Sequence, residues 1–168
     1  MNISVNPKVS AVAVSVALSA TLITSCAIAN GPIEPNHQET AVQLGTFSTS
    51  LAVNDIKASK EFYEKLGFEK AGGNIEQNWL ILRNGSTTIG LFQGILEQNI
   101  MTFNPGWNEL AEPLQQFEDV RDVQSKLKAR GVELTTEAAI GETGPASFTL
   151  EDPDGNQILI DQHVPKAQ

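Results

Sequence analysis

The chain has 168 residues, which is enough for one ordinary domain with an extension but too few for two independent domains. Hydrophobic residues make up 40% and charged residues 18%, a globular composition without long low-complexity tracts. The formal net charge of −9 at pH 7 would repel a phosphate backbone, which argues against nucleic acid as a partner.

Residues 1–25 have the order of a bacterial lipoprotein signal peptide. A short segment with one positive side chain precedes an uncharged, mostly apolar stretch, and the run Ile23-Thr24-Ser25-Cys26 resembles a lipobox. The resemblance implies that Cys26, the only cysteine, carries a lipid that anchors the chain in the cell envelope. Ala27 after it implies the outer membrane, facing the periplasm. A membrane-spanning helix and a plain apolar cysteine are the alternative interpretations.

Residues 26–43 form the predicted link between this anchor and the folded body. They contain proline, glycine and polar residues without hydrophobic periodicity, which is typical of a flexible tether. His37 lies within this tether, so we expect it to be solvated. The folded body is predicted to span residues 44–168.

The body opens with a strand, a helix and three further strands. Alternation over residues 44–54 predicts a strand with Thr49, Leu51 and Val53 on one face. Asp55 is the predicted N-cap of a helix that ends at Gly67. The predicted apolar stripe of this helix is Ile56, Phe62, Tyr63 and Leu66. Strands are predicted near residues 68–71, 79–83 and 87–93, the last two joined by an Asn-Gly hairpin turn.

The same order recurs 64 positions later along the chain. The runs at 55–57 and 67–69 match those at 119–121 and 131–133, which favours duplication of one unit. This predicts a strand over 112–118, a helix over 120–130, and strands near 132–135, 146–151 and 156–163. The first module would then span 44–93 and the second 112–163. In the long connection at 94–111, Phe103 and Trp107 are expected either to form a lid or to pack over an open end of the core.

Two motifs give this doubled unit a family resemblance. The run Phe62-Tyr63-Glu64-Lys65-Leu66-Gly67-Phe68 closes the first helix, and Asp152-Pro153-Asp154-Gly155-Asn156 precedes the last strand. Together they resemble the vicinal oxygen chelate (VOC) superfamily, which includes glyoxalase I, bleomycin-resistance proteins, fosfomycin-resistance enzymes and extradiol dioxygenases. The resemblance implies an α+β fold in which two tandem βαβββ modules form a cup-shaped mixed sheet. These motifs indicate the fold strongly and the function weakly.

The resemblance also implies where a divalent metal would be held. Enzymes of the family use side chains from the first and fourth strands of both modules, and these positions fall here on Ser48, Gly90, Glu112 and Leu159. Only Glu112 is a good ligand, so we expect no metal and no cofactor.

Two arrangements would restore donors to the cup. Glu112, Asp161 and His163 could form a displaced metal site or an acid and base pair. A one-residue register error would bring Gln93 and Gln162 into the cavity instead.

The sequence therefore predicts a membrane-tethered cup that binds a small organic molecule without metal. The residues expected to line the cavity are Ser48, Ser50, Phe92, Glu112, Leu114 and Asp161, with Phe103 and Trp107 as the lid. The alternatives are a metal-dependent glyoxalase-type lyase, isomerase or dioxygenase with non-standard ligands, and a non-catalytic interaction module. Free strand edges are compatible with a homodimer.

Overall fold

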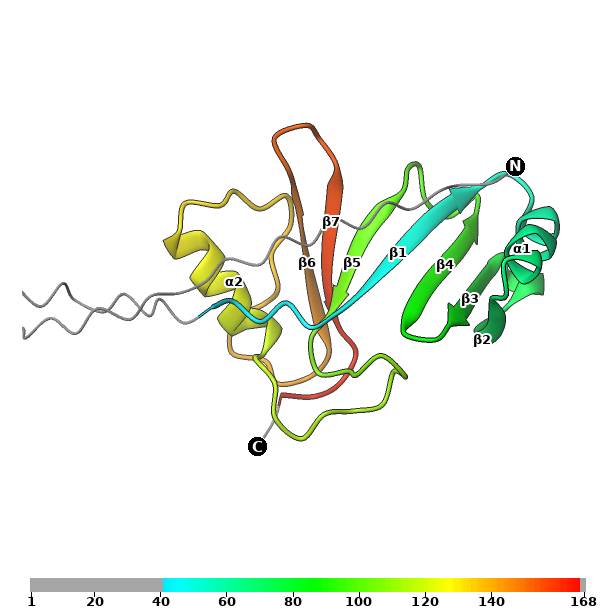
Figure 1. The fold of residues 1–168 in the computed structure, drawn as a ribbon. Coiled ribbons are helices and arrows are strands. Elements are labelled where there is room, and N and C mark those ends of the chain that lie inside the picture. Colours follow the sequence, from blue (N-terminus) through cyan, green and yellow to red (C-terminus); the bar gives the residue numbers. More distant parts are fainter. Residues whose placement is uncertain (1–40, 167–168) are drawn as a thin grey trace, which may run out of the picture. The chain divides into compact units, whose positions relative to one another are not determined.

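The computed structural model of the chain describes residues 41–166, in which two α-helices accompany one seven-stranded mixed sheet (Figure 1). The signal peptide, Cys26, His37 and most of the predicted tether lie outside the described residues. In chain order the elements are β1 Thr46–Val53, α1 Ile56–Lys65, β2 Glu69–Asn74, the 3-10 turn η1 Ile75–Gln77, β3 Trp79–Asn84, β4 Thr87–Gln93, β5 Ile100–Asn104, α2 Val120–Ala129, β6 Ala146–Glu151 and β7 Gln157–Gln162.

Two half-sheets join side by side to make the sheet. The strand order is β2-β3-β4-β1-β5-β7-β6, with β1 parallel to β4 and antiparallel to β5, and β5 parallel to β7. We call residues 46–93 the first half and residues 100–162 the second half. The pairing of β1 with β5 is the seam between them, and it turns two small sheets into one.

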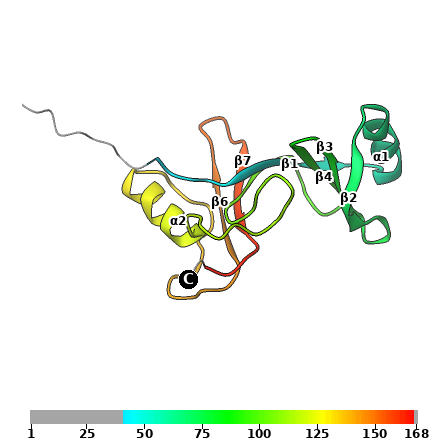
Figure 2. The same ribbon diagram turned by 60° about the horizontal axis from the view of Figure 1, so that its bottom comes forward.

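Both helices pack on the same face of the sheet, at its two ends (Figure 2). Helix α1 covers β3 and β4, and α2 covers β6 and β7. Beneath each lies a separate core. The buried apolar residues of the first core are Ile56, Leu80, Leu82, Ile89 and Leu91. Those of the second core are Val120, Val123, Ala138, Phe148, Leu150 and Ile160.

The helices begin where the sequence predicts, because each has an aspartate N-cap. The Asp55 carboxylate accepts hydrogen bonds from the backbone N–H groups of Lys57 and Ala58 at 2.9 and 3.0 Å. The predicted apolar stripe of α1 is wrong in part, since Phe62 and Leu66 are 56% and 54% exposed. Ile56 and the half-buried Tyr63 are seven positions apart, close to two full turns, and share the inner face. Phe62 is turned about 100° from Tyr63 around the helix, and Leu66 is the C-cap that follows the last helical residue.

The last strand of each half confirms the predicted register. Gln93 Oε1 accepts a hydrogen bond from the Ile56 N–H at 2.8 Å, and Gln162 Oε1 accepts one from the Val120 N–H at 2.7 Å. Both glutamines therefore lie on the helix face and close the first turn of a helix. The register error that would bring them into the cup does not occur.

The first strand of the second half differs from the prediction. The strand expected over 112–118 is instead β5 at Ile100–Asn104, and residues 112–118 lie in the loop before α2. The offset of 64 holds between the helices (Ile56 to Val120). The register gives an offset of 52 between the first strands, since Thr49 pairs with Ile89 as Met101 pairs with Ile158. A longer loop between strand and helix in the second half breaks the single offset.

Two further expectations change at the edges of the domain. Residues 132–135 form no strand, although the Thr135 N–H still donates to the Thr149 carbonyl at 2.8 Å. At the other end, Val42 packs against the second core and the Gln43 N–H donates to the Glu118 carboxylate at 3.1 Å. The end of the predicted tether therefore packs with the fold.

Candidate functional site

The face of the sheet opposite the two helices is the candidate site, and we call it the cup face. Strand alternation and the pairing registers place one set of side chains there. The set is Ser48, Ser50, Trp79, Ile81, Arg83, Thr88, Gly90, Phe92, Thr102, Leu159 and Asp161. Hydroxyl and apolar groups thus dominate the centre of this face, and its charged groups lie toward its margins.

A cavity of about 320 Å³ lies between the first half of the cup face and the loop at 107–111. Its volume is at the lower end of the range for small-molecule sites. Both tryptophans of the chain line it, Trp79 from β3 and Trp107 from the loop. The other lining residues include Ser48, Gly72, Ile81, Arg83, Thr88, Asn108, Glu109 and Leu110.

Asn108 holds the loop over this cavity. Its side-chain oxygen accepts hydrogen bonds from the backbone N–H groups of Leu110 and Glu112 at 2.9 and 3.0 Å. Its side-chain nitrogen donates to Glu112 Oε2 at 2.7 Å. One amide therefore satisfies both ends of a tight turn, so the loop keeps its form without a regular strand.

Trp107 ties the same loop to both halves of the sheet. Its indole ring stacks on the imidazole of His163, with centroids 4.3 Å apart and an interplanar angle of 12°. Its backbone carbonyl accepts a hydrogen bond from the Thr46 hydroxyl at 2.7 Å. Trp107 is thus held by the segment after β7 and by the start of β1, which fixes one wall of the cavity.

Asp161 favours the protonated form of His163, the residue whose imidazole stacks on Trp107. Its Oδ2 lies 3.1 Å from His163 Nε2. This hydrogen bond, together with the negative charge of Asp161, outweighs partial burial and raises the pKa of His163 above its ordinary 6.5. The protonated imidazole favours the electron-rich face of the Trp107 indole.

The predicted site residues fall into two groups in the structure. Ser48 lines the cavity, and the Ser50 hydroxyl lies 3.1 Å from that of Thr102 at the seam between the halves. Phe92 lies on the cup face with Gly90, and Asp161 holds His163.

Three predicted positions require correction. Glu112 is exposed on the loop and bonded to Asn108, because the strand expected there is absent. Leu114 is 42% exposed and lines a different hollow. Phe103 is not part of a lid, since it lies in β5 on the helix face and packs against the second core. Its ring centroid lies 5.2 Å from that of Phe47. Trp107 does line the cavity.

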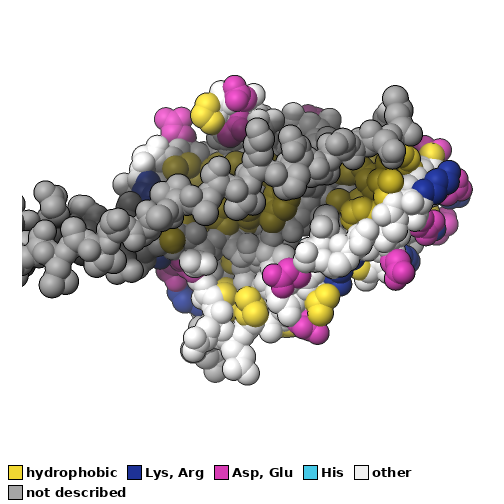
Figure 3. Space-filling model, in the orientation of Figure 1, with side chains coloured by type: hydrophobic (Ala, Val, Ile, Leu, Met, Phe, Trp, Pro, Cys, Tyr) yellow, Lys and Arg dark blue, Asp and Glu magenta, His cyan; other side chains and the backbone are white. Residues whose placement is uncertain are grey.

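The hollow that Leu114 lines has a volume of about 710 Å³ and adjoins the cavity, since Thr88, Trp107, Asn108 and Glu109 line both. Phe47, which is 49% exposed, and Thr49 line this hollow from β1. In Figure 3 hydrophobic side chains are visible over the middle of the sheet, and charged side chains of both signs gather over α1.

The donors on the cup face do not fit a divalent metal. By register, Ser48 and Ile100 are equivalent in the two halves, as are Gly90 and Leu159. A Cβ at Gly90 would lie 2.5 Å from the Phe92 ring, so the ring fills the space that a ligand side chain there would need. A serine hydroxyl alone is a poor ligand.

The displaced arrangement does not assemble either. Asp161 and His163 contact each other, whereas Glu112 is held by Asn108. Within residues 41–166, no three His, Cys, Asp or Glu side chains group so that they could hold a metal ion.

Several lining residues were missed by sequence reasoning. Trp79, Ile81 and Arg83 alternate with the buried Leu80 and Leu82 on β3, and this alternation is the signal that could have found them. Asn108 gave no such signal, because its role depends on a turn in an irregular segment.

The chain matches the model of a known protein family. Residues 44–160 match the model of the Glyoxalase/Bleomycin resistance protein/Dioxygenase superfamily. No curated protein matched significantly. Among the residues that the structure describes, no helix is long and apolar enough to cross a membrane.

Solved structures resemble the chain at low sequence identity. NAD-dependent benzaldehyde dehydrogenase from Legionella pneumophila is 15% identical with a TM-score of 0.52, over 70% of this chain and 98% of that one. A glyoxalase/bleomycin resistance protein/dioxygenase superfamily member from Vibrio splendidus 12B01 is 16% identical with a TM-score of 0.49, over 69% and 97%. Homoprotocatechuate 2,3-dioxygenase from Brevibacterium fuscum is 16% identical with a TM-score of 0.46, over 72% and 37%.

The family match covers most of the chain, and the structure contains the mixed sheet with two helices on one face. The chain belongs to the glyoxalase/bleomycin resistance protein/dioxygenase superfamily.

Proposed function

We propose that this protein binds a small organic molecule in the cavity between the cup face and the loop at 107–111, without a metal. The cavity itself carries the proposal. It has two aromatic walls and a few polar groups, the usual arrangement of a small-molecule site.

The construction of the loop supports this proposal. Three hydrogen bonds of the Asn108 side chain hold the turn beside the cavity. Trp107 is held by ring stacking and by its backbone carbonyl. A wall that is already ordered lowers the entropy lost when a ligand binds.

Intrinsic fluorescence tests the proposal directly, because Trp79 and Trp107 are the only tryptophans and both line the cavity. Purified protein would be titrated with a panel of small aromatic and aliphatic compounds, and its melting temperature measured in parallel. We expect at least one compound to change the fluorescence and to raise the melting temperature by mass action. Failure of the whole panel at millimolar concentration would instead favour a non-catalytic interaction module.

Two single variants locate the binding. Trp79→Phe and Trp107→Phe each leave one tryptophan as a reporter, and both remaining indoles should respond to a bound ligand. If neither variant shows a fluorescence change with the ligand, the ligand binds outside the cavity between Trp79 and Trp107.

The metal-free part of the proposal has its own measurement. Metal analysis of the purified protein should find no divalent ion in stoichiometric amount, and added nickel, zinc, manganese or iron should leave the melting temperature unchanged. A bound ion at one equivalent would favour the metal-dependent enzyme of the same superfamily.

We also propose that Cys26 is lipidated and anchors the domain in the cell envelope, at the outer membrane facing the periplasm. The order of positive charge, apolar stretch and lipobox supports this. Labelling with a radioactive fatty acid should mark the full chain, and Cys26→Ser should abolish the label. The matched control Ser25→Ala keeps a small residue before the cysteine and should retain it. An unlabelled wild-type protein would contradict the anchor.

A further inference from the structure

Arg83 is a charged side chain in the cavity, and no carboxylate of residues 41–166 forms an ion pair with it. It lies on β3, is half-buried, and lines the cavity beside Ile81 and Thr88. Its Nε contacts the Thr88 hydroxyl at 3.5 Å, a long and weak hydrogen bond. Within residues 41–166, no carboxylate lies within 4.0 Å of its guanidinium.

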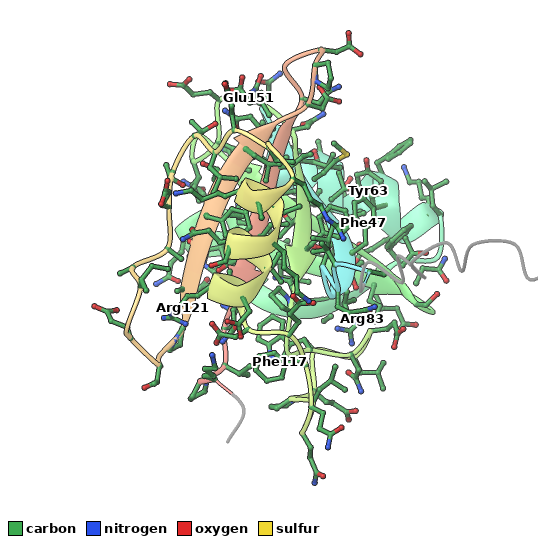
Figure 4. All side chains as sticks on the ribbon, turned by 90° about the vertical axis from the view of Figure 1, so that its left-hand side faces the viewer. Phe47, Tyr63, Arg83, Phe117, Arg121 and Glu151 are labelled. Atoms are coloured by element: carbon green, nitrogen blue, oxygen red, sulfur yellow. The ribbon has the colours of Figure 1, made fainter. Side chains whose placement is uncertain are left out.

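Arg121 offers a comparison, because its guanidinium is neutralised by a carboxylate of the same chain. Arg121 lies at the start of α2, pairs with Asp119 at 3.2 Å, and donates to the carbonyls of Ala139 and Gly144 at 2.9 Å each. Figure 4 shows Arg121 beside α2 and Arg83 away from that helix. Arg121 uses its donors inside the protein, whereas within residues 41–166 the Arg83 side chain, which has five N–H donors, makes a single long hydrogen bond to Thr88.

Two carboxylates lie in the surroundings of Arg83 without pairing with it. Glu69 is its cross-strand partner on β2 and shares its face of the sheet, but it is exposed and forms no ion pair with another described residue. Glu109 lines the same cavity from the loop and is also exposed. Both carboxylates are exposed and neither is within ion-pair distance of the guanidinium, so solvent weakens their effect on its charge without removing it.

We propose that the ligand of this cavity is a small organic acid whose carboxylate pairs with Arg83 while its apolar body lies between Trp79 and Trp107. This inference rests on the proposed function and narrows it to a ligand class. A planar guanidinium matches a carboxylate with two parallel hydrogen bonds, and the partly buried setting strengthens them. The net charge of −9 repels anions in general, so the selectivity comes from this one site.

A matched set of three ligands tests the class. Phenylacetate, phenylacetamide and 2-phenylethylamine share one aromatic body and carry a negative, a neutral and a positive head group. Binding is followed by tryptophan fluorescence and by melting temperature at low ionic strength. We expect the acid to bind roughly ten- to a hundredfold more tightly than the amide, the amine to bind most weakly, and added salt to reduce the preference for the acid.

Arg83→Gln removes the charge and retains a side chain of similar length. The preference for acid over amide should fall to about twofold or less, while binding of the amide itself changes little. Lys57→Gln is the matched control, because Lys57 is exposed on α1 outside the cavity and loses the same charge. Its preference for the acid should equal that of the wild type.

Glu69→Gln provides a second variant that leaves Arg83 intact. Removing the nearby negative charge should strengthen acid binding about two- to fivefold and leave amide binding unchanged. This variant tests the proposal even where Arg83→Gln fails to fold.

The outcomes separate the two proposals. Equal affinity of the wild type for acid and amide overturns the acid class but leaves small-molecule binding intact. An acid preference that persists in Arg83→Gln, or that does not rise in Glu69→Gln, also overturns it. If neither phenyl ligand nor any compound of the wider panel binds, both proposals fail.

Discussion

The two halves of this protein share one unit, yet they hold their helices in different ways. In the first half Asp55 caps α1 from an exposed position and bonds only backbone N–H groups. In the second half Asp119 is 2% exposed, pairs with Arg121, and accepts a hydrogen bond from Gln162 at 3.0 Å.

Their sheets differ as well. The first half contributes four strands and most of the cavity, with Trp79, Ile81 and Arg83 on its cup face. The second half contributes three strands, and its helix is preceded by the long loop that covers that cavity. The two copies of the unit therefore contribute differently to the cavity: the first forms most of its wall, and the second supplies the loop that covers it.

The largest expected difference between the halves lies in the two capping aspartates. Asp119→Ala should lower the free energy of unfolding by about 3–5 kcal/mol, because it leaves the Arg121 guanidinium buried without its counter-charge. Asp55→Ala should cost about 1 kcal/mol, the ordinary value of an N-cap. Urea denaturation of both variants measures the difference, and equal losses would show that the buried pair adds nothing.

The acid side of the stability profile should report the same asymmetry. Burial alone would raise the pKa of Asp119, but hydrogen bonds from Gln162 and Arg121, with the adjacent guanidinium charge, hold this pKa below its ordinary value of 3.8. Its contribution is therefore present above pH 3.8 and is lost as the pH falls through the lower pKa of the folded state. Asp119→Asn should flatten this part of the profile, which melting curves at low pH would show.

A smaller difference is expected for the two glutamines that close the helices. Gln162 is fully buried and bonds the Val120 N–H, the Asp119 carboxylate and the Val164 carbonyl. Gln162→Leu should cost about 2–3 kcal/mol, because buried polar partners lose their hydrogen bonds. Gln93→Leu should cost about 1 kcal/mol, since half-buried Gln93 serves a single N–H. Chemical denaturation measures the free energy of unfolding of both variants. A larger loss for Gln93→Leu would contradict the interpretation that the second half holds its helix more firmly.

The fourth strands should differ at the equivalent positions Gly90 and Leu159. Gly90→Ala should cost about 1–2 kcal/mol, because the new Cβ would press against the Phe92 ring. Gly72→Ala is the matched control on the same face, where a Cβ would lie at an ordinary 3.8 Å from Ile81. Its unfolding free energy should change by less than about 0.5 kcal/mol. If both variants are equally stable, the Phe92 ring does not fill the space above Gly90.

The smallest effect concerns His163, which joins the loop to the second half. Its raised pKa means that the stabilisation is complete below pH 6.5 and is lost as the pH rises through the folded-state value. Since the side chain is 44% exposed, the effect should stay below about 1 kcal/mol. Melting temperatures at pH 5.5 and 8.5 check this against His163→Phe, which keeps the ring stacking without the charge. A variant with the same pH dependence as the wild type would remove His163 from this role.

Much of the first half could be predicted from the sequence, because its signals are local. Asp55, Gly67 and the Asn-Gly turn mark element boundaries through their own backbone chemistry, and the elements lie close to where they place them. The second half was harder, because its first strand was located by a repeat offset. The loop between β5 and α2 is longer than the loop between β1 and α1. Positions before α2 that were inferred from the offset of 64 are therefore misplaced, as Glu112 was.

The site followed the same division. Ser48 and Trp107 were found because strand alternation and an apolar connection are visible along the chain. Arg83 was not singled out, because the role we propose for it depends on the lack of a carboxylate partner among residues 41–166, which only the three-dimensional structure shows. Phe103 was misplaced, since an aromatic residue in a connection gives no signal that distinguishes a lid from a strand of the core.

The sequence by itself determined the family, the two helices with their aspartate caps, and the face of each last strand, because all of these depend on short-range patterns. Only the tertiary structure decided which strand begins the second half, that the Phe92 ring covers Gly90, and that the loop around Asn108 forms the cavity wall. These features depend on contacts between residues far apart in the chain. A local sequence pattern does not show which distant residues come into contact when the chain folds.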